Sequence, residues 1–89
     1  MPTVLFTRAL ERFLPAPSTA VEGATVGTAL AAVFASRPAL RGYVLDDQGG
    51  LRRHVAVYVN GRLVNDSTGL TDPVGPGVVI YVFQALSGG

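Results

Sequence analysis

The chain of 89 residues is 48% hydrophobic and 15% charged, which favours one folded domain and excludes an intrinsically disordered chain. Its formal net charge is +1, and its basic residues, all arginines, are dispersed, so a phosphate-binding face for nucleic acid is not expected. It contains no cysteine, which excludes disulfides, thiolate metal sites and a cysteine nucleophile.

The N-terminal part predicts a pair of strands joined by a loop. Residues 3–7 have the pattern of a strand, with Val4 and Phe6 on one face. The proline-rich residues 14–17 predict a turn or loop, and residues 18–22 return as a second strand. This spacing predicts an antiparallel hairpin with a long loop.

One amphipathic helix follows this hairpin. Thr25 is a suitable N-cap, and Arg37-Pro38 ends the helix, with Arg37 near the negative end of the helix dipole. Apolar residues at helical spacing form one buried stripe, which comprises Val26, Ala29, Leu30, Val33 and Phe34. Residues 39–43 predict only a short extra turn.

The second half of the chain predicts strands separated by tight turns. Residues 46–50 form a turn signal that joins a short strand at residues 43–45 to a longer strand at residues 54–59. Asn60-Gly61 predicts a type I′ hairpin turn, from which residues 62–64 return as a strand.

The last predicted strand bears on function as well as on fold. A turn-rich connection at residues 67–77 leads into an unbroken apolar run at residues 78–83. Alternate residues of a strand point to opposite faces, yet both sets are apolar here, and one helix covers only one face of a sheet. Either loops cover Tyr81 and Phe83, or these side chains form an apolar patch to which a partner protein docks.

The predicted order of elements is β-β-α-β-β-β in a single domain. One helix that covers one face of a four- or five-stranded sheet is an α+β roll. No apolar run reaches the roughly 20 residues that cross a bilayer. The N-terminus also lacks the basic start of a secretory signal. We therefore expect a soluble, cytoplasmic protein with no membrane and no nucleic-acid partner.

Few side chains are candidates for catalysis or metal binding. His54 beside Arg52-Arg53 could bind a phosphate or nucleotide, but we favour a solvated strand start. Asp46-Asp47 lacks the ligand count of a calcium loop and fits a turn. Asp66 and Asp72 fit turn residues whose carboxylates accept backbone hydrogen bonds. Because the chain has one histidine and no cysteine, we expect no nucleophile–base pair and no metal site.

Short motifs occur in a characteristic order along nearly the whole chain. They are Thr25-Val26-Gly27 at the helix start, Val57-Tyr58-Val59-Asn60-Gly61 at a strand and its turn, Gly77 before the last strand, and Gly88-Gly89 at the C-terminus. In order and spacing they resemble the MoaD/ThiS family of ubiquitin-like β-grasp sulfur carriers, which has Thr-Val-Gly, Val-Asn-Gly, a tight turn and a terminal diglycine at these places.

The chain departs from the family pattern near its end. Gly75-Pro76-Gly77 stands where the family has Gly-Asp-Glu, Gln84 and Ala85 replace its common prolines, and Ser87 replaces its usual alanine. In length the chain is similar to the molybdopterin synthase small subunit and to the carrier of cysteine biosynthesis. Residues 46–55 look most like the latter, whereas the start of the tail looks more like thiamine-type carriers, so the pathway stays open.

The resemblance implies a ubiquitin-like β-grasp domain at residues 1–84, with a mixed sheet packed on one main helix, and a flexible tail at residues 85–89. It also implies a sulfur carrier that is a protein substrate and not itself an enzyme. A ubiquitin-activating-type enzyme would use ATP to adenylate the Gly89 carboxylate, and a sulfur donor would convert it into a thiocarboxylate for cofactor or cysteine biosynthesis. Gly88 and Gly89 lack Cβ atoms and would suit a narrow channel in the partner. The partner would also contact the tail and its root at Tyr81, Phe83, Ala85, Leu86 and Ser87.

Several alternatives stay open beside the carrier. They are the small subunit of molybdopterin synthase, whose tail enters a large catalytic subunit, a protein modifier conjugated through Gly89, and a plain β-grasp binding domain with an inert tail. Further partners would be that large subunit or a cysteine or thiazole synthase, and no cofactor would be permanently bound. Gly89 would be either the encoded terminus or a residue exposed by trimming. The chain has no lysine, so it could not itself receive a modifier on a lysine.

Overall fold

The computed structural model describes residues 1–6 and 18–84, and these contain five strands and two helices. In chain order the elements are β1 (Thr3–Phe6), β2 (Ser18–Ala20), α2 (Val26–Ser36), α3 (Pro38–Val44), β3 (Val55–Val59), β4 (Arg62–Leu63) and β5 (Val79–Gln84). The predicted loop at residues 14–17 and the predicted tail at residues 85–89 lie outside the described residues.

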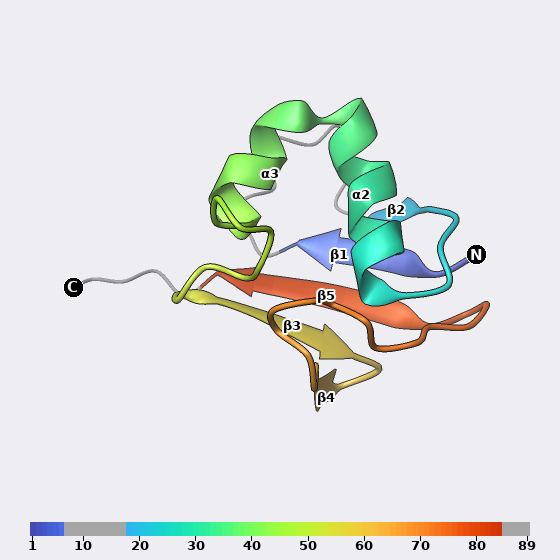
Figure 1. Ribbon diagram of the computed structural model, residues 1–89. Helices are drawn as coiled ribbons and strands as arrows, with labels where there is room; N and C mark the ends of the chain where they lie inside the picture. Colours follow the sequence, from blue (N-terminus) through green and yellow to red (C-terminus); the bar gives the residue numbers. More distant parts are fainter. Residues whose placement is uncertain (7–17, 85–89) are drawn as a thin grey trace.

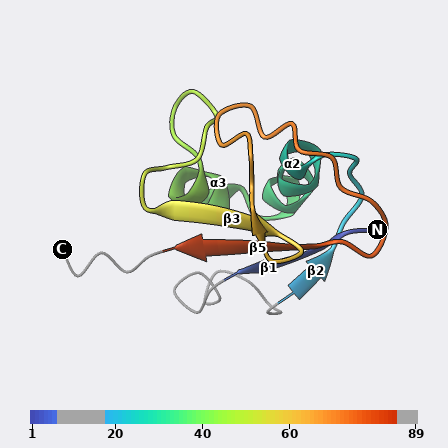
Figure 2. The ribbon, with the colours of Figure 1, turned by 90° about the horizontal axis from the view of Figure 1, so that it is seen from below.

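The described strands form one mixed sheet in the order β2-β1-β5-β3-β4 (Figures 1 and 2). The last strand, β5, occupies the centre, where it pairs in parallel with β1 and antiparallel with β3. The first and the last strand of the described residues therefore lie side by side in the sheet. This arrangement confirms the predicted α+β class and the antiparallel pairing of the first two strands.

Helix α2 begins as the sequence predicts. The Thr25 hydroxyl accepts a hydrogen bond from the Thr28 backbone N–H at 3.1 Å, and the Thr28 hydroxyl accepts one from the Thr25 N–H at 3.0 Å. This reciprocal capping box satisfies two of the donors that a helix N-terminus leaves free. The two N–H groups between them, of Val26 and Gly27, donate to the carbonyls of Asp72 and Leu70, respectively, both at 2.9 Å. The cap thus also fixes the long connection that precedes β5.

A second helix, α3, replaces the short turn and the short strand that were predicted after Pro38. Pro38 lies in the first turn of α3, where its missing N–H has no cost. Leu40 and Val44 are one helical turn apart and are both fully buried. The strand at residues 43–45 is therefore a wrong prediction, because burial of this pair outweighs the strand propensity of the segment. Within residues 43–45, only Leu45 takes part in a β-bridge, with Leu51.

Both helices pack on the same face of the sheet (Figure 1). The core between them consists of buried apolar side chains, of which the largest fully buried are Leu30, Leu40, Ile80, Val4, Val26, Val44, Val57 and Val82. The opposite face carries no helix among the described residues. No described helix is long and apolar enough to cross a membrane.

The turn between β3 and β4 has the predicted type I′ geometry, with positive φ at both Asn60 (49°) and Gly61 (83°). Asn60 also has a role that the turn signal does not reveal. Its N–H donates to the Val79 carbonyl, and its side-chain oxygen accepts from the Val79 N–H, both at 2.8 Å. This pair of hydrogen bonds fixes the start of β5 against the hairpin turn.

Candidate functional site

The end of β5 is the point from which the predicted tail leaves the domain. Gln84 is its last residue and lies opposite Val55, the first residue of β3. The predicted reactive residues Gly88 and Gly89, and the predicted contact residues in the tail, lie outside the described residues; the contact residues are Ala85, Leu86 and Ser87. The candidate site is therefore built from what surrounds the end of β5.

The two faces of β5 differ sharply in exposure. Ile80 and Val82 point toward the helices and are fully buried. On the other face, Tyr81 is 37% exposed and Phe83 is 42% exposed. Loops among the described residues thus leave these two rings accessible, which favours the predicted apolar patch over the alternative of loop coverage. Their ring centroids lie 6.3 Å apart in an edge-to-face arrangement.

Neighbouring strands extend this patch across the sheet. In the strand registers, Leu5 and Tyr58 flank Tyr81, Ala56 lies beside Phe83, and Leu63 lies beside Tyr58. We call this surface the open face; it consists of Leu5, Ala56, Tyr58, Leu63, Val79, Tyr81 and Phe83. Leu63 is 60% exposed. An apolar surface of this kind, next to a chain end, is typical of a protein–protein contact.

The sequence predicted the exposed face of the last strand but not the residues that extend it on the neighbouring strands, which are Leu5, Ala56, Tyr58 and Leu63. A signal for two of them was present, because the Asn60-Gly61 turn fixes the hairpin register and places Tyr58 opposite Leu63. Leu5 could not be assigned in this way, since β1 and β5 are far apart in the sequence and no turn fixes their register.

The acidic residues hold loops together, as predicted. The Asp66 carboxylate accepts hydrogen bonds from the Gly69 N–H at 2.8 Å and the Thr71 hydroxyl at 2.7 Å, and these lower the pKa of Asp66. The Asp72 carboxylate accepts from the backbone N–H groups of Asn65 and Asp66 at 2.9 Å. No group of three side chains that could hold a metal ion occurs within the described ranges.

The Asp46 carboxylate likewise closes the loop at residues 46–50. Its Oδ1 accepts hydrogen bonds from the backbone N–H groups of Gln48 and Gly50, at 2.9 and 3.0 Å. The prediction that Asp46-Asp47 marks a turn is confirmed.

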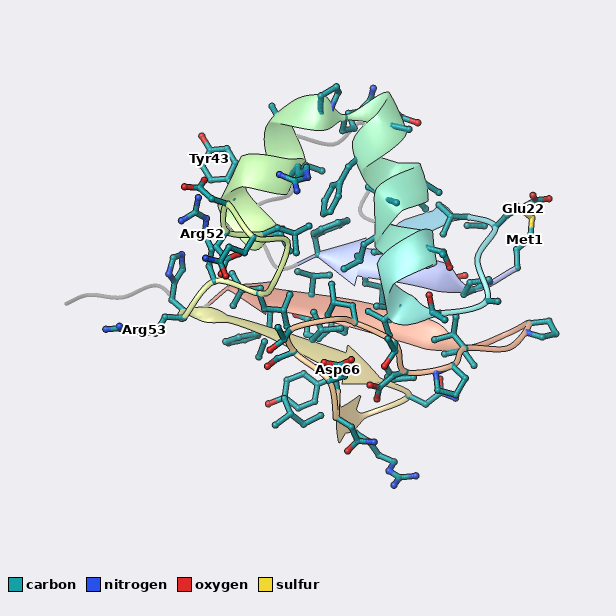
Figure 3. All side chains as sticks on the ribbon, in the orientation of Figure 1. Met1, Glu22, Tyr43, Arg52, Arg53 and Asp66 are labelled. Atoms are coloured by element: carbon teal, nitrogen blue, oxygen red, sulfur yellow. The ribbon has the colours of Figure 1, made fainter. Side chains whose placement is uncertain are left out.

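The basic residues that precede β3 lie at the end of the molecule where β5 finishes (Figure 3). The Arg52 Nε donates to the Gly42 carbonyl at 2.6 Å and so ties this segment to α3. Arg53 and His54 are exposed in the turn just before Val55. The predicted solvated strand start is therefore confirmed for these two residues.

Comparison with known proteins places this geometry among related folds. The sequence model of the ThiS family matches residues 6–89. The fold is similar to that of a chain in the BexX/CysO complex of Amycolatopsis orientalis, at 27% identity and a TM-score of 0.87, with all of both chains covered. SAMP1 of Haloferax volcanii is 28% identical, with a TM-score of 0.83 over 99% of this chain and 98% of that one.

CysO of Mycobacterium tuberculosis is 25% identical, with a TM-score of 0.84 over 97% of this chain and 100% of that one. Comparison with curated proteins finds no significant match. The predicted β-grasp fold and the resemblance to the MoaD/ThiS-type carriers are thereby confirmed.

Proposed function

The chain belongs to the ThiS family of ubiquitin-like proteins, and we propose on this basis that it is a sulfur carrier activated at the carboxylate of Gly89. The main observation behind the proposal is the position of β5, the strand from which the predicted tail leaves the domain. The strand that leads to Gly89 is the central strand of the sheet, and it presents Tyr81 and Phe83 on the open face beside the point of exit. A partner that docks on the open face would therefore receive the tail in a fixed direction.

The chemistry requires activation because a carboxylate is a poor electrophile. An oxygen of the Gly89 carboxylate would attack the α-phosphorus of ATP in the partner enzyme and release pyrophosphate. Sulfide would then attack the acyl carbon of the adenylate and release AMP, which leaves a thiocarboxylate. A persulfide donor would instead give an acyl disulfide, which a thiol would reduce to the same product. Activation and transfer are thus separate covalent steps.

The partner, and not this chain, would supply the catalytic groups. The chain has no cysteine and a single histidine, His54, which is exposed. No nucleophile with a supporting base can be built from this set. The ATP would bind in an adenylating enzyme of the ubiquitin-activating type, and this chain would act as its protein substrate. The thiocarboxylate would then supply sulfur for the biosynthesis of a cofactor or of cysteine.

A second candidate function is protein modification through Gly89. It is favoured by the likeness to a Haloferax volcanii protein described as small archaeal modifier protein 1, which is 26% identical with a TM-score of 0.75. Both functions share the adenylation step and differ in the group that attacks the adenylate. Sulfide gives a thiocarboxylate, whereas a lysine amine on a target protein gives an isopeptide bond.

The proposal is tested by intact-mass spectrometry after incubation with ATP, sulfide and the adenylating enzyme of the same organism. We expect a mass increase that matches exchange of one oxygen for sulfur. Oxidation of Met1, the only methionine, gives nearly the same mass change, so fragmentation must place the change on Gly89. A variant that lacks Gly89 is the control. No change on Gly89, with an enzyme active on another carrier, would refute sulfur transfer; heavier conjugates in cell extract would support the modifier.

A further inference from the structure

Two exposed basic residues flank the root of the tail. Val55 pairs with Gln84, so Arg53 and His54, which directly precede Val55, lie beside the place where the chain leaves β5. Figure 3 shows Arg53 projecting away from the sheet at this end of the molecule. The neighbouring Arg52 is engaged with the Gly42 carbonyl and has a structural role, whereas Arg53 does not share it.

The charge of Arg53 is available for an outside partner. Among residues 1–6 and 18–84, no carboxylate forms an ion pair with Arg53 or His54. Glu22 and Met1 lie at the opposite end of the molecule (Figure 3). As far as the described residues go, the end where β5 finishes therefore carries positive charge that no carboxylate pairs, at the border of the apolar open face. An apolar centre with a charged rim is the usual composition of a protein–protein interface.

The length of the Arg53 side chain, compared with the length of the tail, limits what Arg53 could bind. Gly89 is the fifth residue after Gln84, and an extended chain over five such steps spans about 17 Å. An arginine side chain extends only about 7 Å from its backbone. When the tail is extended into a partner, Arg53 is thus too far from Gly89 to touch the carboxylate or its adenylate. Its ligand is the partner surface around the opening that receives the tail.

We propose that Arg53 and His54 form a basic guide, which binds carboxylates of Asp or Glu at the rim of the tail-receiving opening in the activating enzyme. This inference rests on the proposed function and adds the chemistry of the partner's rim. Arg53 supplies the charge and a planar donor group that matches a carboxylate, and His54 supplies a ring N–H donor. Charges at an interface rim act mainly on the rate of association and make it dependent on salt.

The test measures KM and kcat for adenylation by pyrophosphate release, with the carrier as the varied substrate, at low and high ionic strength. We expect Arg53→Glu to raise KM about tenfold at low salt, with a smaller effect at high salt and an unchanged kcat. Arg53→Gln should have an intermediate effect and His54→Gln a smaller one. Arg62→Glu is the matched control, because Arg62 is exposed on β4 beside the end of β3 that is remote from Gln84. It should change KM less than about twofold.

The outcomes distinguish failure of the basic guide from failure of the proposed function. Wild-type activation together with equal KM values for Arg53→Glu and Arg62→Glu would overturn the guide alone. A fall in kcat without a rise in KM would also overturn it, because that result would place Arg53 at the reacting group. If an enzyme active on another carrier fails to adenylate the wild-type chain, the proposed function fails and the guide fails with it. Thermal melting of each variant checks that the fold is intact.

Discussion

Replacing Phe83 by alanine separates the docking role of the open face from its role in folding. Complete removal of a buried phenylalanine side chain destabilises a protein by about 3–5 kcal/mol. Because Phe83 is already 42% exposed, we expect a loss of about 2 kcal/mol in the free energy of unfolding. A domain of 89 residues has about 4–13 kcal/mol in total, so the variant should remain folded.

We expect Phe83→Ala to weaken binding to the activating enzyme more than this loss of stability suggests. Removing an aromatic anchor from the centre of an interface weakens binding by about 2 kcal/mol or more, which raises KM for adenylation about 30-fold. Val82→Ala is the matched control, because Val82 is adjacent, fully buried and points to the helices. Its loss of stability should be similar, about 2 kcal/mol, while KM stays within about twofold of wild type.

The assay follows pyrophosphate release as a function of carrier concentration, and urea denaturation gives the free energy of unfolding for each variant. If Phe83→Ala and Val82→Ala change KM equally, stability and not docking explains the result, and the open face is not the partner surface. If Phe83→Ala leaves KM unchanged, the open face is not the partner surface, whatever the variant's stability.

Three further predictions concern the core, the loops and the tail. Val57→Asp should unfold the domain, since it buries an unpaired charge at a fully buried position, and circular dichroism would detect this; Ala56→Asp on the other face is the control. The pKa of Asp66 is lowered on folding, so its stabilising effect is complete above the ordinary value of 3.8 and is lost as pH falls through the folded pKa. Asp66→Asn should therefore show a shallower loss of stability below about pH 4 in urea titrations, and a slope equal to that of wild type would contradict this. Deletion of Gly89 should abolish thiocarboxylate formation and leave the melting temperature nearly unchanged; a large fall would mean that the tail packs on the domain.

Local signals in the sequence were sufficient for most of the elements. The helix at Val26–Ser36 was predictable because both its N-cap and its buried stripe lie within a few residues of one another. The turn at Asn60-Gly61 was predictable because few other residue pairs adopt positive φ at both positions. The second helix was missed because Pro38 indicates the end of one helix as readily as the start of the next. Only the packing of Leu40 and Val44 against the sheet distinguishes these two cases.

The candidate site depends on contacts that no local pattern reports. Pairing of β1 with β5 joins residues nearly eighty positions apart, and it brings Leu5 to the open face. Arg53 acquires significance only because β3 and β5 are neighbours with Val55 opposite Gln84. The sequence alone placed Arg53 at a strand start, which is correct, but gave no reason to connect that strand with the tail.

The position of β5 explains how one strand can serve both the fold and a partner. It is paired on both sides, and Asn60 fixes its start through two hydrogen bonds to Val79. Its two faces are therefore held in a constant relation, with Val82 in the core and Tyr81 on the surface. A partner that binds the open face also fixes the direction in which the chain leaves Gln84. Binding energy from side chains that take no part in the reaction would thus orient the Gly89 carboxylate, which is the entropic contribution that positioning makes to a rate.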